Sequence, residues 1–327
     1  MRNTLQAGLT PQRGMGLTLF SEDDLYAIHC ATLEVLYTIG VRVPGEEERQ
    51  IFAGGGATVD NDSKIVKIPA YMVEDAIKNA PSTLLLAGRV PENDYVIHNK
   101  TVAFTNFGEG VKVVNPHTRK AELSTKKHLA DATRICDALE NITVYERALG
   151  ADDVPVEVQS IHNAEAIFNN TTKHCFIGAN CGYNARRIIE MAQAIVGGEK
   201  ELRQRPIYTP LCCPNSPLTL NPDTSEVIME AARAGIPVNV LSMALAGGTS
   251  PVTLAGTLVC HNAEVLSGLV LCQLVHQGNP FIYGSSTTMM DMRFTTAAVG
   301  ASELGMLNAG VAQLAQFYKL PSFVAGG

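Results

Sequence analysis

The sequence predicts an α/β protein, an incomplete (β/α)8 barrel of the TIM type with a small α+β region in front of it. Short apolar runs alternate with stretches of helical periodicity at a spacing of about 30 to 40 residues, which is typical of parallel strands with covering helices. Six strand–helix starts can be counted, whereas a closed barrel of this type requires eight. The 327 residues, 46% of them hydrophobic, are enough to bury a large core.

The six apolar runs are short, as expected for parallel strands buried on both faces. They begin near Ile142, Cys175, Ile207, Val238, Phe281 and Ser322. The helical stretches between them cover 156–170, 184–196, 224–234, 251–276 and 301–318. An open doubly wound sheet is the alternative, but its usual glycine fingerprint in the first βα turn is absent.

Residues 1–130 are expected to form the α+β region, and residues 131–327 the partial catalytic barrel. Ser21 is followed by three acidic residues, a pattern typical of a helix start because the helix dipole favours negative charge there. Apolar residues then recur at helical spacing until Gly40, which suits the position just after a helix end. The region therefore opens with an amphipathic helix.

Further along this region, three glycines at 54–56 lack the spacing of a phosphate-binding loop, so we expect a plain turn. Residues 64–68 indicate a strand, and residues 69–79 a helix with proline in its first turn. Runs at 102–105 and 111–114, separated by Gly-Glu-Gly, predict a hairpin-like segment, and the turn residues after it precede a third short run.

Charge and hydropathy exclude several classes of partner. The net charge of −7, without basic runs, argues against nucleic acid, and the absence of Trp argues against a base-stacking platform. The N-terminus has no apolar signal region, and the longest apolar run, near 265–275, is too short to cross a bilayer. We therefore expect no membrane association and a cytoplasmic location.

The cysteines predict neither disulfides nor a metal site. The eight cysteines form no CxxC pair and lie in or beside apolar runs, so reduced thiols are expected. Cys212 and Cys213 are neighbours on a strand and point to opposite faces, which makes them poor joint ligands. His174, Cys175 and Cys181 lack a regular ligand spacing. We therefore expect no metal.

Several strings, in order along the chain, resemble the trimethylamine:corrinoid methyltransferase family. They are CPNSPL at 213–218, PVTLAGTL at 251–258, HNAEVL at 261–266, GSS at 284–286 and LPSFVAGG at 320–327, with LYTIGV at 36–41 and KIP at 67–69. The resemblance covers essentially the whole chain. These strings distinguish the family well, but they distinguish substrates within the family poorly.

The resemblance implies an enzyme of class EC 2.1.1 that moves a methyl group from trimethylamine to the cobalt(I) of a cognate corrinoid protein, in methylamine-dependent methanogenesis. The corrinoid is carried by the partner, so no cofactor is expected to bind this chain directly. In the trimethylamine branch, pyrrolysine follows the sixth barrel strand, and the matching position comes just after Gly327. The chain is therefore expected to be a fragment that ends at an in-frame amber codon and is inactive alone. We also expect a homo-oligomer.

The chemistry agrees with this expectation. A methyl group on a neutral tertiary amine is a poor electrophile, because the departing amide is far too basic. A fourth substituent on nitrogen makes departure as a neutral amine easy, and an electrophilic imine can provide it. None of the standard side chains in the sequence offers such an electrophile.

Site residues are expected at the ends of the strands, where barrel enzymes carry their chemistry. Glu146 and Asp291 are the candidate catalytic residues, because a carboxylate can balance the positive charge on nitrogen or handle its proton. The candidates for binding substrate or corrinoid are Asn180, Cys181, Thr209, Cys212, Ser242, Ser285, Gly326 and Gly327. The alternative for each is an ordinary loop residue or helix cap.

Two other functions stay open. One is a homologue without pyrrolysine that uses a quaternary amine such as glycine betaine. The other is a non-catalytic protein that binds a small cation, although the candidate loops hold few of the aromatic residues that such sites use. His261 and Asn262 fall inside a long apolar stretch, where polar side chains more often join helices than meet a ligand.

Overall fold

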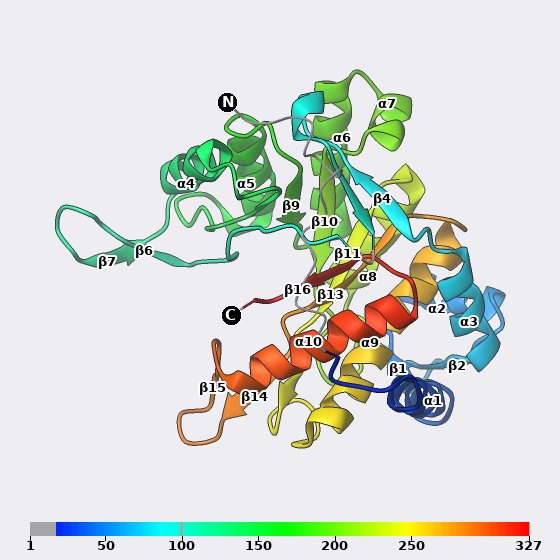
Figure 1. The fold of residues 1–327 in the computed structure, drawn as a ribbon. Coiled ribbons are helices and arrows are strands. Elements are labelled where there is room, and N and C mark those ends of the chain that lie inside the picture. The colour runs from blue at the N-terminus through cyan, green and yellow to red at the C-terminus, as the bar shows by residue number, and fades with distance from the viewer. Residues whose placement is uncertain (1–17, 99–100, 327) are drawn as a thin grey trace. The chain divides into compact units, whose positions relative to one another are not determined.

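The structure, a computed structural model, describes residues 18–98 and 101–326 (Figure 1). The chain divides into two compact units. Unit 1 is Leu84–Leu211, and unit 2 comprises the described residues of Gly14–Thr83 and Cys212–Gly327. The expected division of the chain at residue 130 stays a prediction.

Unit 1 contains three parallel strands that pair in chain order, with helices between them. The strands are β8 (Tyr145–Glu146), β9 (Cys175–Gly178) and β10 (Tyr208–Cys212). The helices are α4 (Lys126–Ala138), α5 (Gln159–Phe168), α6 (Gly182–Val196) and the short α7 (Glu199–Gln204). The strands are short, apolar and buried, as predicted for a parallel sheet.

The rest of unit 1 is made of two small two-stranded sheets and two 3-10 turns. They are β4 (Thr83–Leu86) with β5 (Tyr95–His98), the 3-10 turns η2 (Pro91–Asn93) and η3 (Val156–Val158), and the ribbon of β6 (Lys112–Val114) and β7 (Ala121–Leu123). The hairpin predicted between 102–105 and 111–114 is wrong. Residues 101–109 form no strand because Glu109 and Gly110 donate backbone hydrogen bonds to the segment after β8, and Asn115 closes the later β6–β7 turn instead.

Unit 2 contains the other three parallel strands, again paired in chain order. They are β11 (Val238–Ser242), β13 (Phe281–Ser285) and β16 (Ser322–Val324). The helices are α8 (Pro222–Ala234), α9 (Leu254–Val275) and α10 (Ser302–Phe317), and a small sheet joins β12 (Leu245–Ala246), β14 (Thr288–Asp291) and β15 (Thr296–Ala297). All six predicted strands and all five predicted helical stretches are therefore present in the two units.

The N-terminal elements of unit 2 include the two helices and the strand predicted there. They are α1 (Glu22–Thr38), α2 (Glu46–Gly54), α3 (Ala70–Asn79), and β1 (Val41–Arg42), β2 (Thr58–Asp60) and β3 (Ile65–Lys67), which form one antiparallel sheet. Ser21 and Asp24 form a reciprocal cap at the start of α1, and Gly40 follows the helix end with φ of 83°. Residues 54–56 end α2, so the plain turn is confirmed.

The central helix of unit 2 is α9. With 22 residues it is long and apolar enough to cross a membrane by length and composition, which corrects the expectation drawn from the shorter apolar run. Most of it is buried, and it packs against α1, α2, α3, α8, α10, β11 and β13. These contacts are those of a core helix.

Contacts with α9 show which way the strand side chains of unit 2 point. Val240 lies against Gly268, where an added Cβ would come within 3.0 Å of Val240, and the Tyr283 hydroxyl donates to Asn262 over 2.6 Å. Side chains alternate along a strand, so Asn239 and Gly284 lie on the opposite face. Both polar atoms of the Asn239 side chain are buried without a partner there.

We predict that Gly284→Ala lowers the free energy of unfolding by about 1–3 kcal/mol, because the added Cβ would lie 2.8 Å from backbone atoms of β11. Gly305→Ala is the matched control. Its Cβ meets nothing within 4 Å on α10, so the change should stabilise the protein by about 0.5–1 kcal/mol. Denaturant unfolding measures both, and equal effects of the two substitutions would contradict this packing.

Candidate active site

Glu146 is the last residue of β8 and lies on the inner face of the unit 1 strands. Tyr145, its neighbour, points to the helix side, where its hydroxyl accepts a hydrogen bond from Thr133 of α4 over 2.9 Å. By alternation Glu146 points the other way. Its position at the carboxyl end of a parallel strand is the one from which barrel enzymes take their catalytic residues.

The segment 106–110 lies over Glu146. The Asn106 amide bonds both the backbone N–H and the backbone carbonyl of Glu146, at 3.0 and 2.7 Å. Gly108 approaches so closely that an added Cβ would collide with the Glu146 carboxylate, so only glycine fits without displacing it. None of the described residues donates a hydrogen bond to that carboxylate.

Glu109 and Arg147 complete this cluster. Glu109 pairs with the Arg147 guanidinium, and its N–H donates to the Arg147 carbonyl over 2.9 Å. Its φ of 68° lies in the left-handed region, which is strained for a residue with a side chain. The two contacts with Arg147 hold Glu109 beside Glu146 despite that strain.

Burial raises the pKa of Glu146 to about 7, and the negative charge of Glu109 adds to the rise while Arg147 opposes it. A carboxyl group that titrates near neutral pH can either give or accept a proton under working conditions. Strongly shifted carboxyl groups at strand ends are therefore candidates for catalysis.

The register of the strands aligns Glu146 with Phe176 of β9 and Thr209 of β10. The Thr209 hydroxyl lies 2.9 Å from His174 Nε2. His174 Nδ1 faces two backbone carbonyl oxygens, so it carries the proton and Nε2 accepts from Thr209. Burial lowers the pKa of His174 to about 4, so the imidazole is neutral. Glu109, Arg147 and Phe176 are not among the site residues predicted from the sequence.

Asn180 and Cys181 lie at the start of α6. The Asn180 side chain accepts hydrogen bonds from Ser160 (2.5 Å) and Asn184 (2.8 Å), and it donates to the Val156 carbonyl. Cys181 is the N-cap residue of α6, without a side-chain cap bond. The Asn180 side chain thus joins η3, α5 and α6, and the expected role of Asn180 and Cys181 in binding stays a prediction.

Ser242, at the end of β11, faces α9 rather than the inner face. Its hydroxyl donates to the buried carboxylate of Glu264 over 2.6 Å. The same carboxylate accepts from Ser216 Oγ (2.9 Å), Leu218 N (3.0 Å) and Cys260 Sγ (3.5 Å). Burial raises the pKa of Glu264 although these donors oppose the rise. Glu264 therefore ties the loop after β10 to the end of β11.

Of the other candidates in unit 2, Ser285 is aligned with Ser242 by the register of β11 and β13, whereas Cys212 and Asp291 make separate contacts. Ser285 is buried and its Oγ accepts from Thr287 N, while the buried Cys212 thiol faces the Asn239 carbonyl, and burial raises its pKa. Asp291 accepts from the backbone N–H groups of Arg293 and Phe294, which is the geometry of a turn. Gly326 has open space around it, and Gly327 lies outside the described residues.

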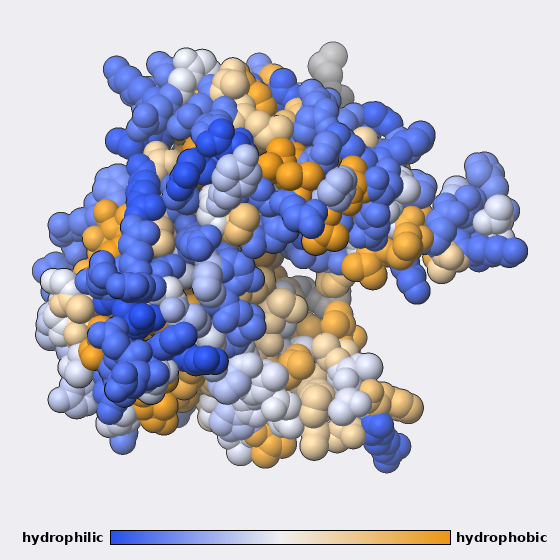
Figure 2. Space-filling view, turned by 180° about the vertical axis from the view of Figure 1, so that it is seen from behind, coloured by the Kyte–Doolittle hydropathy of each residue, from blue (hydrophilic) through white to orange (hydrophobic). Residues whose placement is uncertain are grey.

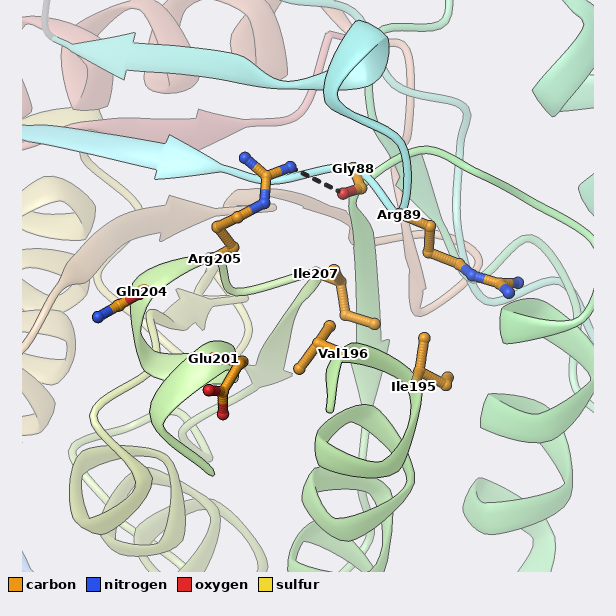
Figure 3. Close-up of a pocket in the computed structure, with 8 residues that line it drawn as sticks. All are labelled: Gly88, Arg89, Ile195, Val196, Glu201, Gln204, Arg205 and Ile207. Atoms are coloured by element: carbon orange, nitrogen blue, oxygen red, sulfur yellow. Dashed lines mark hydrogen bonds between the residues drawn. The ribbon is translucent and has the colours of Figure 1, made fainter. Parts of the chain in front are cut away.

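A cavity of about 300 Å³ lies at the opposite end of the unit 1 strands, beside Ile207 just before β10 (Figure 3). Arg205 reaches Asp94 with two hydrogen bonds of 2.6 and 2.8 Å and points to the Gly88 carbonyl, whereas Arg89 points away (Figure 3). The amino ends of parallel strands are not where barrel chemistry is found. This cavity is therefore not the candidate active site.

A metal site would need several His, Cys, Asp or Glu side chains close together. Residues 18–98 and 101–326 contain no group of three or more His, Cys, Asp or Glu side chains placed to hold a metal ion. All eight cysteines are free in the structure, and their expected reduced state stays a prediction.

Comparison with known proteins identifies the family. The sequence profile described as trimethylamine methyltransferase (MTTB) matches residues 5–327. The chain belongs to the trimethylamine methyltransferase family. This confirms the family inferred from the strings.

Several curated relatives carry the name trimethylamine methyltransferase MttB, two of which are described. The protein from Desulfitobacterium hafniense is 53% identical over 327 residues, which are 100% of this chain and 66% of the relative. The protein from Methanosarcina thermophila is 46% identical over 325 residues, 98% of this chain and 67% of the relative. A glycine betaine methyltransferase from Desulfitobacterium hafniense is 30% identical and is matched over 64% of its length. The chain thus spans about two thirds of the relatives.

Solved structures agree on the fold. The monomethylamine methyltransferase MtmB of Methanosarcina barkeri gives a TM-score of 0.55 over 92% of this chain and 67% of that one, at 12% identity. The crystal structure titled as the hydroxylamine complex of MtmB gives the same values. The predicted class, an incomplete barrel of parallel βα units, is confirmed.

We predict that Glu264→Leu lowers the free energy of unfolding by about 3 kcal/mol, because it leaves the partly buried Leu218 N–H and two hydroxyls without an acceptor. Glu264→Gln should cost about 1 kcal/mol or less, since its carbonyl can accept from Leu218 while the serine hydroxyls rotate to accept from its amide. Glu34→Leu, at an exposed position of α1, is the control. Equal losses for the Leu and Gln variants in denaturant unfolding would refute this assignment.

Proposed function

We propose that this chain belongs to an enzyme that transfers a methyl group from trimethylamine to the cobalt(I) of a cognate corrinoid protein in the cytoplasm. Membership of the family supports the methyltransferase class. Relatives that bear the trimethylamine name are 44–53% identical to the chain, against 30% for the betaine relative. Trimethylamine is therefore the first choice of substrate.

The position of Glu146 carries the proposal. Its carboxyl group is half-buried at a strand end, has a pKa of about 7, and is next to Phe176 in the strand register. An ionised carboxylate beside an aromatic ring suits a methylated ammonium group, through charge and cation–π attraction. Arg147 is already paired with Glu109, so it leaves Glu146 available for such a cation.

Proton handling gives Glu146 its second role. The N–CH3 bond breaks with its electron pair staying on nitrogen, and the cobalt(I) supplies the pair for the new bond to carbon. Nitrogen leaves as neutral dimethylamine only if it carried a fourth substituent beforehand. A carboxyl group that is half protonated near pH 7 can hold or supply the proton on that nitrogen.

The pyrrolysine that the family resemblance implies, expected after Gly327, stays a prediction. Glu146 would have the same role with or without pyrrolysine. An adduct of the amine with an imine also places positive charge on nitrogen. The expectation that this chain alone does not turn over is kept as well.

Glycine betaine is the second candidate substrate, favoured by the betaine methyltransferase among the relatives. Betaine carries a carboxylate that a trimethylamine site does not need to bind. Glu109 and Glu146 are acidic neighbours at the end of β8, and they would repel that carboxylate. The local charge therefore supports the simple amine.

The test uses the enzyme expressed from its native gene with its reduced corrinoid protein, and it follows methylation of the corrinoid spectroscopically. Trimethylamine should be the preferred donor over monomethylamine and glycine betaine. Glu146→Gln should lower kcat by about 10²-fold and remove the limb of the pH profile near 7. Glu157→Gln, an exposed carboxylate of unit 1, is the control. Preference for betaine, or an unchanged pH profile in Glu146→Gln, would overturn the proposal.

A further inference from the structure

The β6–β7 ribbon, residues 111–123, is called the arm here. It projects from the rest of unit 1, as the views from opposite sides in Figures 1 and 2 both show. Nearly all of its residues are exposed. A two-stranded ribbon alone in water is marginally stable, because it has no third strand or helix to cover a face. A projecting ribbon of this kind needs something to pack on.

One face of the arm is apolar and uncovered. The antiparallel register sets Lys112 opposite Leu123 and Val114 opposite Ala121, so these side chains share one face. All four are exposed, with Val114 at 65% and Leu123 at 62%. The other face carries Val113 and Glu122, and Glu122 bonds within the arm to Asn115.

The arm is also basic, in a chain that is acidic. Lys112, Arg119 and Lys120 have no ion-pair partner among residues 18–98 and 101–326. Only Glu122 opposes them on the arm. The whole chain has a net charge of −7, so its surface outside the arm is more acidic still. A second copy of the chain therefore offers the complementary charge.

We propose that the arm is an interface that joins two copies of this chain. The apolar face of Val114, Ala121 and Leu123 packs on the second copy, and the basic side chains meet its acidic surface. Because the copies are identical, the contact can be reciprocal, with each arm lying on the other copy around a two-fold axis. Reciprocity doubles the buried area, which a ribbon of this size needs to reach a stable interface.

The proposal is tested on the protein expressed from its native gene, by light scattering after size exclusion and by sedimentation, from about 1 to 100 μM at 0.1 M salt. The wild-type chain should have at least twice the mass of one copy. Val114→Asp places a charge on the apolar face and should weaken association at least tenfold. Val156→Asp, on a valine that is 70% exposed outside the arm, should leave the mass unchanged.

A second variant separates association from folding. Arg119→Glu with Lys120→Glu reverses charge in the exposed turn, which makes no core contact, and it should also weaken association at least tenfold. High salt should weaken the wild-type contact, since screening acts on exposed charges. A wild-type chain that stays monomeric over the whole range, or arm variants that keep the wild-type mass, would show that the arm does not join copies of this chain.

Discussion

Burial of the apolar helix α9 is the constraint on which unit 2 depends. Its side chains fill the space between β11 and β13 on one side and five other helices on the other. A helix buried all round must satisfy its polar groups inside the protein. Asn262 does so by bonding Thr32 and Tyr318 as donor and Tyr283 as acceptor, which ties α1, α10 and β13 to one residue.

The same rule explains where chemistry can and cannot lie. Side chains that point from the strands toward helices make structural hydrogen bonds: Ser242 bonds Glu264, and Tyr145 bonds Thr133. Among the described residues, the Asn239 side chain of unit 2 and the Glu146 carboxylate of unit 1, each on the opposite face of its strands, have no hydrogen-bond partner. A desolvated acid without donors has a raised pKa, so the lack of structural partners is what prepares Glu146 for a proton or a cation.

The fold was predictable because parallel βα units require short apolar runs to alternate with stretches of helical periodicity, and this alternation is visible in the sequence. Each strand from β8 to β16 is a short apolar run, and Gly40 and Ser21 mark the ends of α1 as expected. The site was less predictable. Glu146 could be placed at a strand end, but Glu109 comes from the turn of a predicted hairpin that does not form, and its approach depends on tertiary hydrogen bonds to Arg147 and Ala148. The side to which Ser242 points follows from its contact with Glu264, which no local pattern reveals.

The central claim is that Glu146 is the group that meets the amine. Carbon-13 NMR of the side-chain carboxyl groups, with the Glu146 signal assigned from Glu146→Gln, tests it without requiring turnover. The account predicts a pKa of about 7 for Glu146, which falls when trimethylammonium is added because the cation stabilises the carboxylate. The uncharged analogue tert-butyl alcohol should leave the pKa unchanged. A Glu146 pKa near the ordinary value of 4.5, or one that does not respond to trimethylammonium, would contradict the account.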